Sequence, residues 1–290
     1  MSYTYDRKGP KRGVSLYSYS EFGWSMTLED CFADMYDMGA HGLEILSNAH
    51  VPYPEITDEF LEEWNRLCDL YEIVPVEYGH WIDTRLYRDR DLTVGECYQQ
   101  LVTDFKIANK LGFHILRTKQ GVKDLLCSPV DNWRDVIYRA LDAAEQYDVC
   151  MCPEIHNPTR LNNPFVSDVC EFIDKTGTKQ FGLNIDFSVF QTNWIPIEKE
   201  GTDAAAEFST VAELEPLLPY VKCCHAKFHH VDENFVEESI PYADIINLMK
   251  EKGWDGYLLS ELEGPEKRKV GGASMALRLQ HIMMKRLMGD

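Results

Sequence analysis

The sequence has 290 residues, and its composition is that of a folded, acidic protein. Hydrophobic residues make up 44% of the chain, which is enough to bury a large core and excludes an intrinsically disordered protein. Lys and Arg number 29 against 48 Asp and Glu, so the formal net charge at pH 7 is −19. This charge argues against nucleic acid and against a membrane surface as partners, because both attract basic proteins.

The sequence also indicates where the protein is found. No stretch approaches about 18 consecutive apolar residues, the length of a membrane span. The first residues include basic side chains but no apolar segment of a secretory signal. The nine cysteines are an odd number without the spacing of a disulfide framework, so we expect reduced thiols, most of them in the core. We therefore expect a cytoplasmic protein.

Short apolar runs alternate with amphipathic stretches along the chain. The runs have the length and branched side chains of buried parallel strands, and they cover residues 13–17, 42–46, 73–78, 113–117, 149–155, 181–186, 220–225 and 256–261. The stretches after them have helical periodicity, at residues 28–38, 60–71, 94–111, 132–147, 167–176, 211–218, 242–252 and 274–287. Eight such pairs predict a single-domain (β/α)8 TIM barrel over residues 1–290. A doubly wound sheet is the alternative, but it normally has a glycine-rich phosphate loop that this sequence lacks.

A polar residue lies at or near the end of each of the last four predicted strands. These residues are Glu154, Asp186, His225 and Glu261, each separated from the next by one β–α unit. Active sites in this fold lie at the C-terminal ends of the strands, so the four side chains are expected to converge. Three carboxylates beside an imidazole repel one another unless a cation joins them. Their oxygen-rich set predicts one divalent metal ion, Mn²⁺ first and Mg²⁺ or Co²⁺ as alternatives, with no organic cofactor. The competing interpretation is that each residue caps its strand or pairs with Lys or Arg.

Weaker candidates lie near the same end of the barrel. His80 and His156 are predicted to contact or deprotonate a substrate, unless they form hydrogen bonds inside the loop layer. Lys227 and Arg117 are predicted to bind substrate, because they lie beside the expected metal ligands or end a strand. Glu44 ends the second strand and either accepts a hydrogen bond from a sugar or pairs with a cation such as Arg117.

Aromatic residues follow the first predicted strand. Trp24, together with nearby tyrosines, is a candidate wall for stacking on a sugar face or an aromatic ring. Core packing explains the same residues equally well.

Five motifs resemble the xylose-isomerase-like barrels of the sugar phosphate isomerase/epimerase superfamily. They span nearly the whole chain: GLEI after the first helix, PEIH around Glu154, GLNID ending at Asp186, HAKF starting at His225, and GYLLSELEG containing Glu261. The resemblance implies that these four residues bind one divalent metal. It also implies that the two glutamates flank the substrate and move protons.

Some positions distinguish branches of that superfamily. The ketose 3-epimerase branch has a His where this chain has Val189 and an Arg where it has Val231. HAKF followed by SELEG instead resembles the metal-binding α subunit of bacterial C-glycoside deglycosidases, which act on C-glycosides oxidised to a ketone at sugar C3. That resemblance implies a small β subunit and an oligomeric assembly.

Both branches remove a proton α to a sugar carbonyl. The predicted function is cleavage of the C–C glycosidic bond of a 3-oxo-C-glycoside by β-elimination, with His156 or His80 as the base. The alternative is a sugar isomerase or epimerase, in which Glu154 and Glu261 exchange the proton. A nuclease related to AP endonucleases conflicts with the acidic charge. A non-catalytic binding or scaffold barrel conflicts with the intact metal set.

Overall fold

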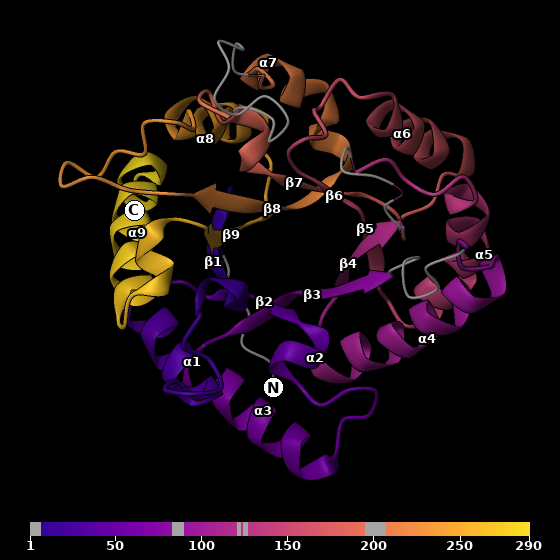
Figure 1. Ribbon diagram of the computed structural model, residues 1–290, viewed down its shortest axis with the longest axis horizontal. Coiled ribbons are helices and arrows are strands. Elements are labelled where there is room, and N and C mark those ends of the chain that lie inside the picture. Colours follow the sequence, from indigo (N-terminus) through magenta and orange to yellow (C-terminus); the bar gives the residue numbers. More distant parts are fainter. Residues whose placement is uncertain (1–6, 83–89, 121–122, 124–126, 195–206) are drawn as a thin grey trace.

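The computed structural model describes residues 7–82, 90–120, 123, 127–194 and 207–290. Figure 1 shows the strands as a ring, with the longer helices packed around its outside. The strands are β1 (Lys11–Ser15), β2 (Gly42–Leu46), β3 (Val74–Ile82), β4 (Ile115–Gln120), β5 (Cys150–Cys152), β6 (Glu154–Ile155), β7 (Leu183–Asp186), β8 (Val221–Phe228) and β9 (Tyr257–Leu262). They follow the order β5-β4-β3-β2-β1-β9-β8-β7-β6, and neighbouring strands are parallel. The predicted TIM barrel is confirmed.

Two strands of the ring, β5 and β6, come from a single predicted strand. They are separated only by Pro153, which has no N–H to donate to a ladder. β5 pairs with β4, whereas β6 pairs with β7. The carbonyl of Pro153 accepts a hydrogen bond from the Asn184 N–H at 3.1 Å, so the junction still contacts β7. The divided strand therefore brings the two ends of the sheet together.

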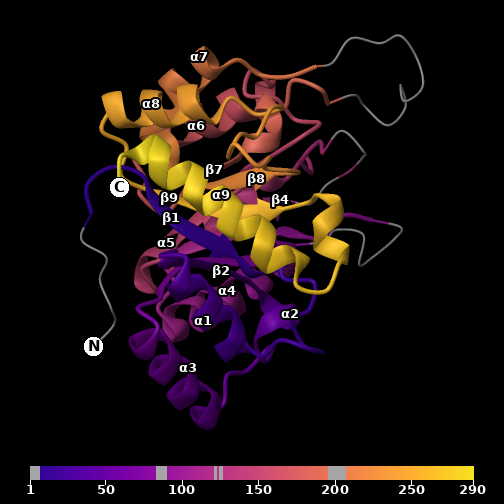
Figure 2. The same ribbon diagram turned by 90° about the vertical axis from the view of Figure 1, so that its left-hand side faces the viewer.

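The helices lie between the strands in chain order. They are α1 (Leu28–Asp37), α2 (Ser47–His50), α3 (Asp58–Leu70), α4 (Val94–Leu111), α5 (Trp133–Gln146), α6 (Pro164–Thr176), α7 (Val211–Leu214), α8 (Tyr242–Glu251) and α9 (Gly272–Met288). Figure 2 shows α9 lying across the outside of the barrel near β1 and β9. The predicted helix at 211–218 ends as an α-helix at Leu214 and continues as the 3-10 helix η5 (Glu215–Tyr220). Pro216 lies at the start of η5, where its missing N–H interrupts the α-helical bonding.

A bulge in β3 decides which of its side chains enter the barrel. Leu43 lies opposite Pro75, but Glu44 lies opposite Glu77, so Val76 is an extra residue in β3. β3 also continues past the predicted end of the strand at residue 78. After the bulge, Glu77 contacts residues across the barrel interior, which we call the lumen.

The core has two parts. A large cluster fills the layer between strands and helices, and Tyr78 belongs to it, with its ring 6.1 Å from that of Phe113. A smaller cluster inside the lumen contains Val76, Cys223 and Leu259. All nine cysteines are free, and six of them are buried. Among the described residues, no helix has both the length and the apolar character needed to cross a bilayer.

Candidate metal centre

Four side chains from consecutive strands converge at the C-terminal end of the barrel. Nδ1 of His225 lies 3.1 Å from Glu154 Oε1, 3.7 Å from Asp186 Oδ2 and 2.9 Å from Glu261 Oε2. One ligand atom from each of the four residues lies within 4.8 Å of the others. The register of β7 and β8 sets Asp186 directly opposite His225, and the Ser188 N–H orients the other Asp186 oxygen at 2.6 Å. The four residues that the sequence spacing predicts to converge do lie close together, while their role as ligands stays a prediction.

The two glutamates of this group are held in their charged form. Burial alone would raise the pKa values of Glu154 and Glu261. Arg117, His156 and His225 together outweigh burial and hold the pKa of Glu154 well below its ordinary value. Lys227 and His225 lower the pKa of Glu261 in the same way. Both glutamates therefore present negative charge to the same point.

The same point suits a divalent cation. Burial alone would lower the pKa of His225, but the carboxylates of Glu44, Glu261 and Glu154 raise it well above its ordinary value. The negative charge that raises this pKa would also attract a divalent ion. Oδ2 of Asp186 is buried without a hydrogen-bond partner among the described residues. A set of carboxylate oxygens with one imidazole nitrogen matches Mn²⁺ or Mg²⁺, so these residues fit the predicted metal.

Arg117 joins two carboxylates from different strands. Its Nε donates to Glu44 Oε1 at 2.7 Å, and one terminal nitrogen donates to Glu154 Oε2 at 2.8 Å. Glu44 is fully buried, so the pairing alternative for this residue is the one found in the structure. Arg117 also lines the cavity described below. The place of Arg117 in the sequence predicts substrate binding, whereas its observed contacts orient the side chain of Glu154.

Sequence reasoning missed the residues below His225. Glu77 Oε2 lies 3.0 Å from His225 Nε2, and Asn184 Nδ2 lies 3.1 and 3.0 Å from the two Glu77 oxygens. The Cys223 thiol donates to Glu77 Oε1 at 3.3 Å. The available signal was a carboxylate inside the apolar run IVPVEY, since such a residue must point at a partner when it is buried.

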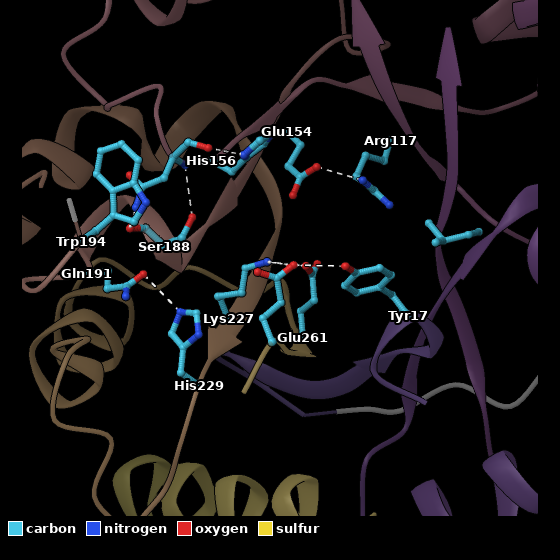
Figure 3. A pocket seen from close by; sticks show the side chains of 13 residues that line it. Tyr17, Arg117, Glu154, His156, Ser188, Gln191, Trp194, Lys227, His229 and Glu261 are labelled. Atoms are coloured by element: carbon cyan, nitrogen blue, oxygen red, sulfur yellow. Dashed lines mark hydrogen bonds and ion pairs between the residues drawn. The ribbon is translucent and has the colours of Figure 1, made fainter. Parts of the chain in front are cut away.

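A cavity of about 430 Å³ opens above this group. Figure 3 shows Trp194, Ser188 and His156 on one side, Tyr17 and Arg117 on the other, and Lys227 with Glu261 between them. The described residues that line it are Tyr17, Leu46, Arg117, Glu154, His156, Asn157, Ser188, Gln191, Trp194, Lys227, His229, Glu261 and Glu263. Apolar and polar surfaces are thus both present, as in most small-molecule sites.

Lys227 is a second cation in the wall of this cavity. Its ammonium contacts Glu261, lies 3.2 Å from Glu263 Oε1 and lies 3.6 Å from Asp186 Oδ2. Burial would lower the pKa of Lys227, but Asp186, Glu261 and Glu263 raise it well above its ordinary value. Its charge therefore balances the acidic group, and its position at the cavity agrees with a substrate contact.

The two predicted catalytic histidines are placed differently. His156 lines the cavity, and its Nδ1 lies 2.6 Å from the backbone oxygen of Asn157. His80 is 22% exposed at its side chain, and its Nδ1 lies 2.6 Å from Asp104 of α4. His80 is not among the described residues that line the cavity. Its alternation after the Val76 bulge directs it toward the helices.

The structure also shows where Trp24 and His229 lie relative to the cavity. Trp24 is 68% exposed, and its indole N–H donates to the Ser20 carbonyl at 3.2 Å. It is absent from the described lining of the cavity, whereas Tyr17 and Trp194 are part of it. His229, on the segment after β8, also lines the cavity and lies 3.1 Å from Gln191 Oε1. These aromatic positions depend on loop paths, which strand and helix patterns do not fix.

The chain is similar to known proteins over nearly its whole length. It is 27% identical to the C-glycoside deglycosidase alpha subunit of Arthrobacter globiformis, covering 96% of this chain and 92% of that protein. It is 25% identical to the 3'-dehydrocarminate deglycosidase alpha subunit of a Microbacterium species, covering 97% and 96%. A solved structure of D-psicose 3-epimerase in the presence of D-fructose shares the fold, with a TM-score of 0.67, 14% identity and coverage of 97% and 100%.

A family model defines the group to which these similarities point. The model described as xylose isomerase-like TIM barrel matches residues 32–279. This range includes all four residues of the acidic group and both predicted catalytic histidines. The chain therefore belongs to the xylose isomerase-like TIM barrel family.

Proposed function

We propose that this chain is the metal-binding α subunit of a C-glycoside deglycosidase. Its substrate would be a C-glycoside with a ketone at sugar C3, and the bond broken would join sugar C1 to a carbon of the aromatic aglycone. The observation that carries the proposal is the convergence of Glu154, Asp186, His225 and Glu261 at a cavity of about 430 Å³. Two relatives named deglycosidase alpha subunits, similar over nearly the full chain, support it.

The reaction is a β-elimination. A base removes the proton on C2, and the electron pair first forms an enolate with the C3 ketone. The enolate then restores the C3 carbonyl and forms a C1=C2 double bond, while the bond from C1 to the aglycone breaks. The aglycone carbon keeps that electron pair and takes a proton. The products are an enone sugar and the free aglycone, so atoms and electrons balance.

The acidic group supports the first step. When bound there, a divalent ion supplies Lewis-acid stabilisation of the negative charge that develops on a sugar oxygen. Glu154, Asp186, His225 and Glu261 would hold it, with Arg117 and Lys227 fixing the two glutamates through ion pairs. A sugar bound above them would lie against His156, Lys227 and Tyr17 in the cavity wall.

His156 is the base that the geometry favours. Its Nδ1 lies 2.6 Å from the Asn157 carbonyl, which accepts the Nδ1–H. When the ring is neutral its lone pair is therefore on Nε2, which lies 4.0 Å from Cys127 Sγ. His156 also lines the cavity, whereas Glu154 and Glu261 are occupied by ion pairs and by the predicted metal.

A sugar isomerase or epimerase is the second candidate. Glu154 and Glu261 both line the cavity with lowered pKa values, so each is ionised and able to accept a proton. The positions that carry His and Arg in the 3-epimerase branch weaken this candidate. They are Val189 and Val231 here, and both side chains are buried in the core.

A second, small subunit belongs to the proposal as well. The two relatives are each named an alpha subunit, which implies a partner in those proteins. Native mass measurement after co-expression with a candidate small subunit tests this part separately.

The decisive experiment incubates the protein, with its partner subunit, with Mn²⁺ and either a 3-oxo-C-glucoside or a panel of ketoses. Release of free aglycone is the expected result, while a changed ketose configuration would select the epimerase. Glu154→Gln is expected to lose both bound Mn²⁺, measured by elemental analysis, and aglycone release. Glu59→Gln is the control, since Glu59 is exposed on α3. Full activity in Glu154→Gln would contradict the proposal.

A further inference from the structure

The imidazole of His225 lies between two acidic groups. Nδ1 faces Glu154, Asp186 and Glu261, whereas Nε2 faces the opposite direction. Glu77 Oε2 lies 3.0 Å from Nε2, and Glu44 Oε2 lies 3.3 Å from it. The His225 ring and the side chains of Glu44 and Glu77 are fully buried, so water does not take part in choosing the proton's position.

Two protonation patterns compete for this ring. If Nε2 carries the proton, it donates to Glu77 and leaves the Nδ1 lone pair free. Asn184 Nδ2 also lies 3.0 Å from Nε2 and is a donor. If Asn184 donates to Nε2, the proton of the neutral ring must lie on Nδ1, which then cannot bind a cation. Whether Nε2 donates to Glu77 or accepts from Asn184 therefore decides whether Nδ1 can be a ligand.

We propose that Glu77 is the positioning residue that keeps the proton of His225 on Nε2, so that Nδ1 stays free to bind a divalent cation. This inference rests on the metal centre of the proposed function and assigns a residue that the four-ligand set does not include. Glu77 reaches across the lumen from β3 to the opposite wall at β8.

The surroundings of Glu77 fix its orientation for this task. Asn184 spans both of its oxygens, and the Cys223 thiol donates to Oε1 at 3.3 Å. These donors leave Oε2 directed at the imidazole. Asn184 is drawn to Glu77, a charged acceptor, in preference to the neutral ring nitrogen, because hydrogen bonds to carboxylates are the stronger ones. A carboxylate behind a ligating histidine typically strengthens metal binding 10- to 100-fold.

The test measures Mn²⁺ affinity by calorimetry without any substrate. Glu77→Gln keeps the side-chain volume, and we expect its Kd for Mn²⁺ to rise about 10- to 100-fold. Asn184→Ala removes a donor that orients Glu77 but keeps the carboxylate, so its Kd is expected to rise less than that of Glu77→Gln. Equal Kd values for wild type and Glu77→Gln would overturn the inference.

A second measurement is made on the wild-type protein, and a variant serves only to assign the signal. In ¹⁵N-labelled wild type loaded with Zn²⁺, long-range ¹H–¹⁵N spectra should show His225 protonated on Nε2, with the signal assigned from its loss in His225→Gln. A proton on Nδ1 would overturn the inference, even if the enzyme releases aglycone. Conversely, a normal Nε2–H signal together with no aglycone release would leave this inference standing and contradict the proposed function.

Discussion

The difference between His156 and His80 lies in what their ring nitrogens contact. Because His156 lines the cavity, His156→Gln should slow removal of the substrate C2 proton about 10²- to 10⁴-fold. His80 is bonded to Asp104 on α4, so His80→Gln should change this rate only slightly. Deuterium wash-in at C2, followed by mass spectrometry, measures the step directly. Wild-type exchange in His156→Gln would refute its role as the base.

At the residue scale, the sequence predicted the four charged residues at the strand ends better than the residues that orient them. Glu154, Asp186, His225 and Glu261 were predictable because strand ends recur with each β–α unit, and the fold places those ends together. Glu77 and Asn184 were missed because their partners lie on distant strands, which spacing along the chain does not reveal. The histidine tautomers likewise depend on neighbours that only three-dimensional packing brings near.

At the element scale, the junction of β2 and α2 depends on a neutral histidine. The Leu46 N–H donates to His50 Nδ1 at 2.8 Å, and burial lowers the pKa of His50 to about 4 from the ordinary 6.5. The unfolded chain therefore takes up this proton first as the pH falls, so stability is lost between pH 6.5 and about 4. Leu46 lines the cavity, which links this junction to the site.

The matching prediction compares His50→Gln with wild type. The variant retains an acceptor without a titrating ring, so its free energy of unfolding should fall less between about pH 7 and pH 5. Urea denaturation at both pH values measures the difference. His230→Gln, at an exposed position, is the control and should keep the wild-type pH dependence. Identical pH dependence in all three proteins would contradict the prediction.

The strands themselves were predictable, but their irregularities were not. Every predicted run overlaps a strand of the barrel, because apolar branched runs between helices are the main signal of buried parallel strands. The extra residue Val76 leaves no trace in that pattern, and it reverses the alternation of the residues after it. Simple alternation would place His80 on the lumen side, and the bulge explains why Glu77 is there instead.

At the scale of the whole molecule, the barrel encloses more negative than positive side chains. The buried carboxylates around His225 belong to Glu44, Glu77, Glu154, Asp186 and Glu261, and the neighbouring cations are Arg117 and Lys227. Such an imbalance opposes folding unless protons or a metal reduce it. Binding a cation at this point should therefore stabilise the entire protein.

Thermal unfolding tests this expectation. At 100 times its Kd, Mn²⁺ is expected to add about 2.7 kcal/mol to the free energy of unfolding. Each kcal/mol corresponds to about 2–4 °C for domains near this size, so the Tm should rise by several degrees and return after EDTA treatment. Glu154→Gln should show a smaller rise. Equal Tm values with Mn²⁺ and with EDTA would argue against a metal centre in the lumen.

The bulge at Val76 has a consequence for how barrels of this kind diverge. Deleting that one residue would set Pro75 and Glu77 next to each other opposite Leu43 and Glu44, so the carboxylate behind His225 would keep its place. Closing the bulge without a deletion would instead shift the register by one residue, which turns Glu77 outward and the His80 imidazole inward. A loss of this bulge at constant strand length, rather than individual replacements, would then change two acid–base groups of a related barrel in a single event.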